Sequence, residues 1–131
     1  MDKKKCIMIC DDDDDILEVS RLILVGKGYK VETTCTSHGL IQKAETLLPD
    51  VILMDLRIPT LGGEEMTKRL KANQATCHIP VIIFSANALA ESIANECGAD
   101  GVLPKPFSIV EMEKQIERQL LSAGNQSEVS F

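Results

Sequence analysis

Five polar side chains, each at or close to the end of a short apolar segment, have the types needed to bind a metal ion and accept a phosphoryl group. They are Asp11, Asp12, Asp55, Ser85 and Lys105. Three carboxylates held close together repel one another, and a divalent cation is the natural compensator. Hard oxygen ligands that leave room for water favour Mg²⁺. We therefore expect Asp11, Asp12 and Asp55 to bind Mg²⁺, provided that the fold gathers them.

Asp55 is the best candidate for a nucleophile, because it stands alone at the end of the apolar segment 51–54. A carboxylate can accept a phosphoryl group and become an aspartyl phosphate. In that transfer negative charge spreads over three phosphoryl oxygens, so the protein mainly neutralises and positions them. One oxygen would face the cation, a second the ammonium of Lys105 and a third the hydroxyl of Ser85.

These side chains can meet only if the apolar segments are neighbouring strands. Strands are expected over residues 6–10, 31–35, 51–54, 81–84 and 101–103. Between them apolar residues recur with the 3.6-residue period of helices, over residues 16–25, 39–48, 64–73, 89–97 and 109–121. This strict alternation predicts an α/β fold, a doubly wound parallel sheet of five strands with five helices on both faces. The strand ends would then share one edge, where such sheets bind ligands.

Length and charge narrow the classes of protein that this chain can belong to. Its 131 residues correspond to one domain, expected over residues 4–121, followed by a polar C-terminal tail or linker stump over 122–131. The chain carries 20 acidic and 14 basic side chains, and five of the acidic ones form the run Asp11–Asp15. Direct binding to nucleic acid is not expected, because it requires clustered basic residues.

The remaining composition points to the cytoplasm. The five cysteines show no CxxC spacing and mostly lie in apolar segments, so we interpret them as buried free thiols of a reducing compartment. No apolar run reaches the roughly 18 residues that span a bilayer, so no membrane association is expected. The apolar stretch after the N-terminal lysines is too short for a signal peptide.

Longer motifs surround the five residues, and jointly they resemble the receiver domain of two-component response regulators, of the chemotaxis-regulator type, over about residues 4–121. The motifs cover residues 7–17, 49–59 with Gly63, 81–86, 98–101 and 105–107. The resemblance implies a flavodoxin-like sheet of order 2-1-3-4-5 with Asp55 as the phosphoacceptor. It also implies that Asp12 binds Mg²⁺ directly, Asp11 mostly through water, and Arg57 through its backbone carbonyl, while Ser85 and Lys105 contact the phosphoryl group.

The resemblance further implies partners and a cycle. A sensor histidine kinase or phosphotransfer protein would donate the phosphoryl group, and hydrolysis would later remove it. The output would pass to a downstream protein or a second receiver, and no enzymatic activity beyond self-phosphorylation and autodephosphorylation is expected. In the family, an aromatic side chain three residues before the lysine reorients with the hydroxyl residue; here Val102 stands there, and an aliphatic side chain cannot make the same reorientation.

Other interpretations remain open on the residues alone. Asp11 and Asp12 could cap a helix, Asp55 could be a turn residue, and Ser85 or Lys105 could be surface residues. A phosphatase or phosphotransferase of the haloacid dehalogenase type would use the Asp-x-Asp pair Asp11 and Asp13, but the chain lacks a late acidic pair for its metal. A module that keeps the fold but signals without phosphorylation would also fit Val102.

Overall fold

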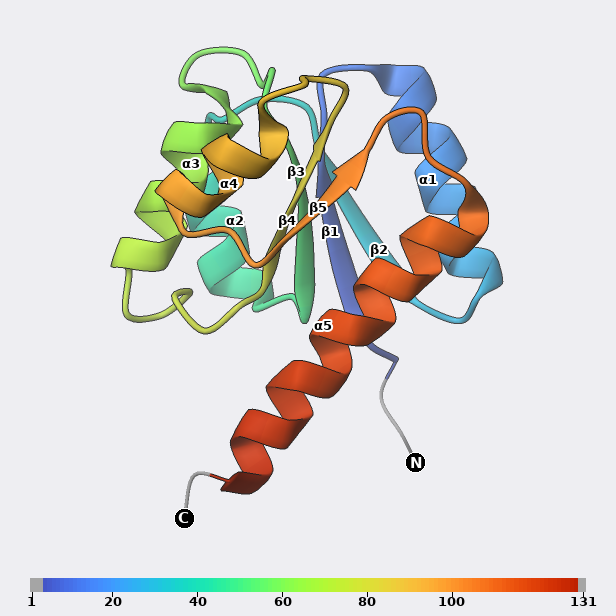
Figure 1. Ribbon diagram of the computed structural model, residues 1–131, viewed down its shortest axis with the longest axis vertical. Coiled ribbons are helices and arrows are strands. Elements are labelled where there is room, and N and C mark those ends of the chain that lie inside the picture. Colours follow the sequence, from blue (N-terminus) through green and yellow to red (C-terminus); the bar gives the residue numbers. More distant parts are fainter. Residues whose placement is uncertain (1–3, 130–131) are drawn as a thin grey trace.

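The computed structural model describes residues 4–129, with side chains described as far as residue 122, and its centre is a single parallel sheet (Figure 1). The strands are β1 (Cys6–Cys10), β2 (Lys30–Thr34), β3 (Val51–Asp55), β4 (Val81–Ser85) and β5 (Gly101–Pro104). Their order is β2-β1-β3-β4-β5. The predicted α/β class and strand order are therefore confirmed.

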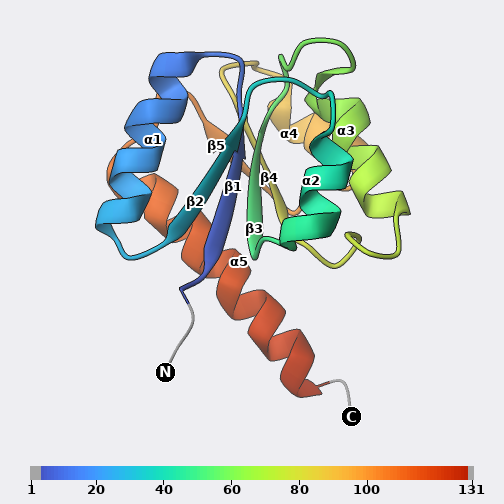
Figure 2. The same cartoon turned by 180° about the vertical axis from the view of Figure 1, so that it is seen from behind.

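Five helices connect and follow the strands, as predicted: α1 (Asp14–Gly26), α2 (Leu40–Leu47), α3 (Gly62–Ala72), α4 (Ala90–Cys97) and α5 (Ile109–Val129). Helices α1 and α5 cover one face of the sheet, and α2, α3 and α4 cover the other (Figures 1 and 2). The chain changes face between α1 and α2, so the connections after β1 and β3 diverge. A crevice for a ligand is expected at the carboxyl ends of those two strands.

Two side-chain cores lie on opposite faces of the sheet. Because successive strand residues point to opposite faces, Met8 and Ile52 pack with α2, α3 and α4, whereas Ile7 and Leu53 pack with α1 and α5. The strands β3 and β4 are buried along their whole length. This explains why their sequences are continuous apolar runs instead of alternating patterns.

Local sequence signals account for three of the helix ends. The Asp13 carboxylate accepts hydrogen bonds from the backbone N–H groups of Asp15 and Ile16, and so caps α1. Ser108 and Glu111 form a capping box at the start of α5. Gly98 ends α4 with a φ of 85°, a conformation that glycine adopts at little cost.

Most observed boundaries lie within one or two residues of the expected ones, and the end of one helix lies further away. Strand β2 begins one residue earlier than predicted, and α3 begins at Gly62 instead of residue 64. Helix α5 continues to Val129, and so includes most of the segment expected to be a polar tail. Residues 122–129 contain no proline to stop a helix, and Figure 1 shows the last turns of α5 running beyond the sheet. Residues 130–131 lie outside the described part, and the domain limits themselves stay a prediction.

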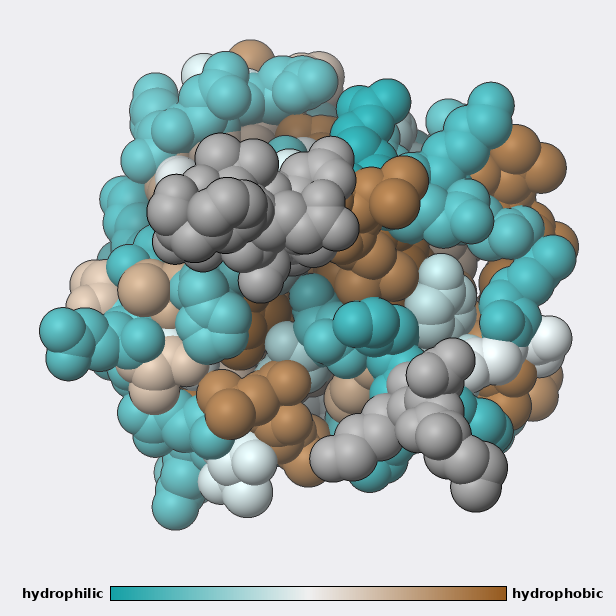
Figure 3. All heavy atoms as spheres, turned by 90° about the horizontal axis from the view of Figure 1, so that it is seen from below, coloured by the Kyte–Doolittle hydropathy of each residue, from teal (hydrophilic) through white to brown (hydrophobic). Residues whose placement is uncertain are grey.

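The cysteines are less uniformly buried than expected. Cys10 and Cys97 are buried and Cys6 is half-buried, but Cys35 and Cys77 are exposed, because they lie just after β2 and in the connection that follows α3. All five are free thiols. Among the described residues, no helix is both long enough and apolar enough to cross a bilayer. Figure 3 views the end of the molecule from which β1 starts, where hydrophobic residues are interspersed among hydrophilic ones.

We expect Ser20→Ala to stabilise the fold. Ser20 lies within α1 and is fully buried, and its hydroxyl is the only buried side-chain N or O atom of the described residues without a hydrogen-bond partner. Removing an unpaired buried hydroxyl is expected to add about 1 kcal/mol to the free energy of unfolding, or roughly 4 °C in melting temperature. Ser92→Ala, an exposed helical position, is the control for helix propensity alone; an equal gain there would contradict the explanation.

Candidate functional site

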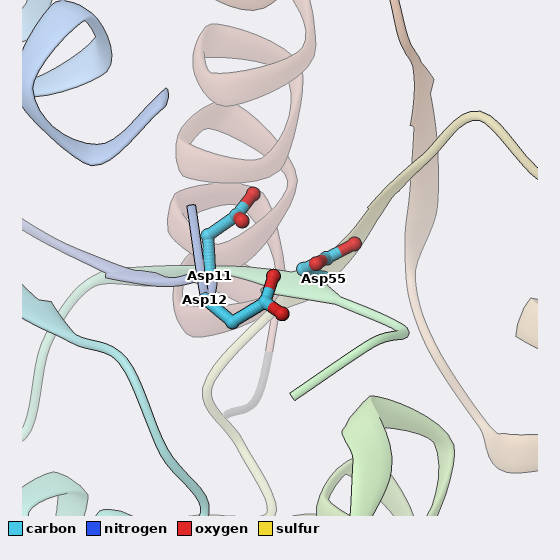
Figure 4. A group of neighbouring side chains, drawn as sticks. All are labelled: Asp11, Asp12 and Asp55. Carbon is cyan, nitrogen blue, oxygen red and sulfur yellow. The ribbon is translucent and has the colours of Figure 1, made fainter. Parts of the chain in front are cut away.

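Three carboxylates meet where β1 and β3 end (Figure 4). Cys10 and Met54 are paired in the sheet, so Asp11 and Asp55, which follow them, lie side by side. One oxygen from each of Asp11, Asp12 and Asp55 lies within 4.8 Å of the others. Asp11 and Asp55 are 1% and 4% exposed, whereas Asp12 is exposed to solvent. Two of the three acids are therefore buried side by side, which is costly unless positive charge compensates them.

Lys105 supplies part of that compensation. Its Nζ atom lies 2.7 Å from Asp11 Oδ2 and 3.5 Å from Asp55 Oδ1. The ammonium also lies 4.6 Å from the centre of the Phe84 ring, in the arrangement of a cation–π contact. The backbone N–H of Lys105 donates to the carbonyl of Ser85, and its peptide bond to Pro106 is cis. Strands β4 and β5 thus hold this side chain against the acids.

The electrostatics of Asp55 reflect this crowding. Its pKa is raised, first because burial disfavours the charged carboxylate and second because Asp11 is close. The Lys105 ammonium and the backbone N–H of Arg57 oppose the increase, and Asp12 adds to it. A cation between the carboxylates would act in the same direction as Lys105 and favour the ionised, nucleophilic form.

A cleft of about 400 Å³ opens above these side chains, lined by Asp11, Asp12, Asp13, Asp55, Arg57 and Lys105. The cleft therefore brings together five of the six residues of the predicted site. Ser85 is the exception: it lies at the end of β4, is buried, and does not line the cleft. Its hydroxyl accepts a hydrogen bond from the backbone N–H of Asn87 at 3.0 Å.

The structure adds residues that the sequence reasoning did not assign to the site. Asp13 was expected only at the start of a helix, and it caps α1 and also lines the cleft. Gly63 packs against the backbone of Asp55, and Ser37 contacts the connection that follows Asp55. Gly63, the second of two successive glycines, is a signal that could have indicated close backbone packing. Nothing in the sequence around Ser37 indicates its partner.

The donor set fits a hard divalent cation. Carboxylate oxygens from Asp11, Asp12 and Asp55 are the ligands that Mg²⁺ uses in proteins, and the exposure of Asp12 leaves room for retained water. One oxygen of Asp11 is paired with Lys105, and the other accepts the backbone N–H of Asp13 at 2.9 Å. Both carboxylate oxygens of Asp11 thus already have a partner within the protein.

The comparisons with known proteins agree with one another. The sequence model of the response regulator receiver domain matches residues 7–117. The polar-differentiation response regulator DivK of Brucella anthropi is 33% identical over 120 residues, which cover 88% of this chain and 96% of DivK. The phosphate regulon transcriptional regulatory protein PhoB of Pseudomonas aeruginosa is 33% identical over 125 residues, 92% of this chain and 53% of PhoB.

The chain thus spans about half the length of PhoB and of the Bacillus subtilis regulator PhoP. Among solved structures, the receiver domain of the sensor histidine kinase PA1611 from Pseudomonas aeruginosa is 28% identical and superposes with a TM-score of 0.84. The match covers 90% of this chain and 98% of that one. That crystal structure has a magnesium ion coordinated in its active site cleft.

Proposed function

The chain belongs to the response regulator receiver domain family, and from that premise we propose that it accepts a phosphoryl group on Asp55 and relays the signal to a protein partner. The observation that carries the proposal is the position of Asp55. Its carboxylate is buried beside Asp11, within reach of Asp12, and 3.5 Å from the Lys105 ammonium. A carboxylate of this kind can be both compensated and reached from the cleft.

The proposed transfer needs little covalent chemistry from the protein. A carboxylate oxygen of Asp55 bonds to phosphorus while the bond from phosphorus to the donor's histidine nitrogen breaks; water later hydrolyses the product to carboxylate and inorganic phosphate. Lys105 stays close to Asp55 and pairs with a phosphoryl oxygen. Ser85 turns from the N–H of Asn87 towards the phosphoryl group, since its hydroxyl does not line the cleft.

Asp11, Asp12, Asp55 and the backbone carbonyl of Arg57 are the proposed holders of Mg²⁺. When bound, the ion would supply positive charge to a phosphoryl oxygen and to the crowded acids. The donor is proposed to be a sensor histidine kinase or phosphotransfer protein, in the cytoplasm, and the receiver of the signal a downstream protein or a second receiver. Beyond its own phosphorylation and dephosphorylation we propose no enzymatic activity.

The two rival functions are less well supported. A phosphatase of the haloacid dehalogenase type would need Asp11 and Asp13 free as nucleophile and acid/base. Asp11 instead pairs with Lys105, and Asp13 accepts two backbone N–H groups at the start of α1. The interaction module that works without phosphorylation is suggested by Val102 alone, which lies partly buried against the core beneath α4.

Incubation with acetyl phosphate and Mg²⁺ separates the three. The receiver should gain one phosphoryl group per chain, stable to acid and labile to hydroxylamine, and removal of Mg²⁺ with a chelator should prevent it. Intact-protein mass spectrometry measures the added phosphoryl group with and without the chelator. Treatment with hydroxylamine then shows whether that group is removed. Repeated turnover of added phosphate esters would favour the phosphatase instead, and an unmodified chain that still binds Mg²⁺ would favour the interaction module.

A further inference from the structure

The connection that follows Asp55, residues 56–61, is called here the acceptor loop, and its backbone is strained at one position. Thr60 has a φ of 86°, although branched side chains rarely adopt positive φ. Such a conformation costs on the order of 1–3 kcal/mol and persists only where surrounding contacts impose it. Something outside the loop must therefore hold it.

Ser37 makes the contacts that flank Thr60. Its hydroxyl donates to the carbonyl of Pro59 at 2.9 Å and accepts from the backbone N–H of Leu61 at 3.2 Å. Its own backbone N–H also donates to the Pro59 carbonyl, at 3.3 Å. Ser37 is 6% exposed and belongs to the connection between β2 and α2, so these bonds join two connections at the same edge of the sheet.

The other end of the acceptor loop lies at the phosphorylation site. The N–H groups of Gly62 and Gly63 donate to the carbonyls of Ile58 and Leu56, both at 3.0 Å, and fold the loop back on itself. Arg57 lies between those two carbonyl groups, and its backbone N–H faces the Asp55 carboxylate. A change at residues 59–61 would thus be passed to the backbone of Arg57.

We propose that Ser37 is a positioning residue for the phosphorylation site. Its hydroxyl holds the acceptor loop in the strained conformation that places the Arg57 backbone beside Asp55, where its carbonyl would help to hold Mg²⁺. The inference rests on the proposed function, since it assigns Ser37 a role at that same site. Ser37 touches neither Asp55 nor the cleft, so it acts only through the loop.

The test is Ser37→Ala in the full chain, with Mg²⁺ itself as the titrant in isothermal calorimetry. Loss of a partner that orients metal ligands typically lowers metal affinity 10- to 100-fold, and we expect about a tenfold loss here. Hydrogen exchange of the Leu61 amide should become faster in the same variant. Ser37→Thr keeps the hydroxyl and should retain most of the affinity.

Thr34→Val is the matched control. Thr34 is the last residue of β2; its hydroxyl also donates a hydrogen bond, to the carbonyl of Thr36 at 3.3 Å, and none to the acceptor loop. Its Mg²⁺ affinity and Leu61 exchange should equal those of the wild type. Protection of the amides in β1 and β3 shows in every variant whether the sheet is intact.

The results separate the two claims. If Ser37→Ala binds Mg²⁺ as tightly as the wild type while Leu61 exchanges faster, Ser37 anchors the loop without positioning the site, and the inference is overturned. An equal loss in Thr34→Val would overturn it as well. Failure of the wild-type chain to bind Mg²⁺ at all would overturn the proposed function, and this inference with it.

Discussion

Asp55→Asn is expected to abolish phosphorylation by acetyl phosphate and Mg²⁺. The amide has almost the shape of the carboxylate but is not a nucleophile, and it removes one of three acidic oxygens that lie within 4.8 Å of one another. The mass increase of one phosphoryl group, measured on the intact chain, should be absent. Asp50→Asn is the control, because Asp50 precedes β3 at the opposite end of the strand, and among the described residues its carboxylate accepts only the N–H of Cys6.

For the same variant we also expect a change in the stability of the fold, which can be measured without any phosphorylation assay. Burial and the neighbouring Asp11 raise the pKa of Asp55 above its ordinary value of 3.8, so the folded chain binds a proton there more tightly than the unfolded chain does. The stability of the wild type therefore falls as pH rises from the unfolded-state pKa of Asp55, 3.8, through its higher folded-state pKa. Ionised Asp55 thus destabilises the fold at neutral pH.

Without divalent cations, Asp55→Asn should therefore melt at a higher temperature than the wild type at pH 7. The difference should shrink at a pH well below 3.8, where Asp55 is protonated in both the folded and the unfolded state. Thermal unfolding followed by circular dichroism measures both. A phosphorylated Asn variant would show that the acceptor is another residue, and a variant less stable at pH 7 would show that Asp55 is not under electrostatic strain.

Gly63→Ala is expected to have the largest effect on stability. Gly63 lies at the start of α3, and a β-carbon there would overlap the carbonyl oxygen of Asp55 and lie 2.8 Å from its carbonyl carbon. Both are backbone atoms of a buried strand, so neither can move aside cheaply. We expect a loss of about 3 kcal/mol in the free energy of unfolding, or roughly 10 °C in melting temperature.

Phosphorylation of Gly63→Ala should also slow, because α3 or the Asp55 backbone must shift to relieve the overlap. Gly26→Ala is the control: the last residue of α1 has no atom within 4 Å of an added β-carbon, and its helix propensity improves. Denaturant unfolding of both variants measures the difference. Equal stability of Gly63→Ala and the wild type would mean that α3 does not press on the acceptor strand as described.

Most of the fold could be predicted from the sequence because the spacing of its apolar residues is clear. Continuous apolar runs before Asp55 and Ser85 correctly indicated strands covered on both faces, and their alternation with helical stretches led to a parallel sheet. In such a sheet the residues after β1 and β3 must be neighbours, so the proximity of Asp11 and Asp55 followed from topology. Their chemical roles stay predictions.

What the sequence could not supply were contacts between connections. The bonds from Ser37 to Pro59 and Leu61 join segments 22 and 24 residues apart, and no period or spacing encodes them. The same is true of the 2.7 Å ion pair between Lys105 and Asp11, which joins the connections after β5 and β1. The end of α5 was misplaced for a different reason, since a polar sequence without proline permits a helix that its composition does not demand.

The sheet separates two groups of side chains that share no member, one with α1 and α5 and one with α2, α3 and α4. Repacking on one side reaches the other mainly through the strand backbone, so replacements on opposite sides are expected to have nearly additive effects on stability. Each half of the interior is therefore free to diverge on its own during evolution. Pairs of replacements that compensate each other are expected within one of the two cores. The acidic cleft follows the strand ends, so it can be kept while the side chains of either core are replaced.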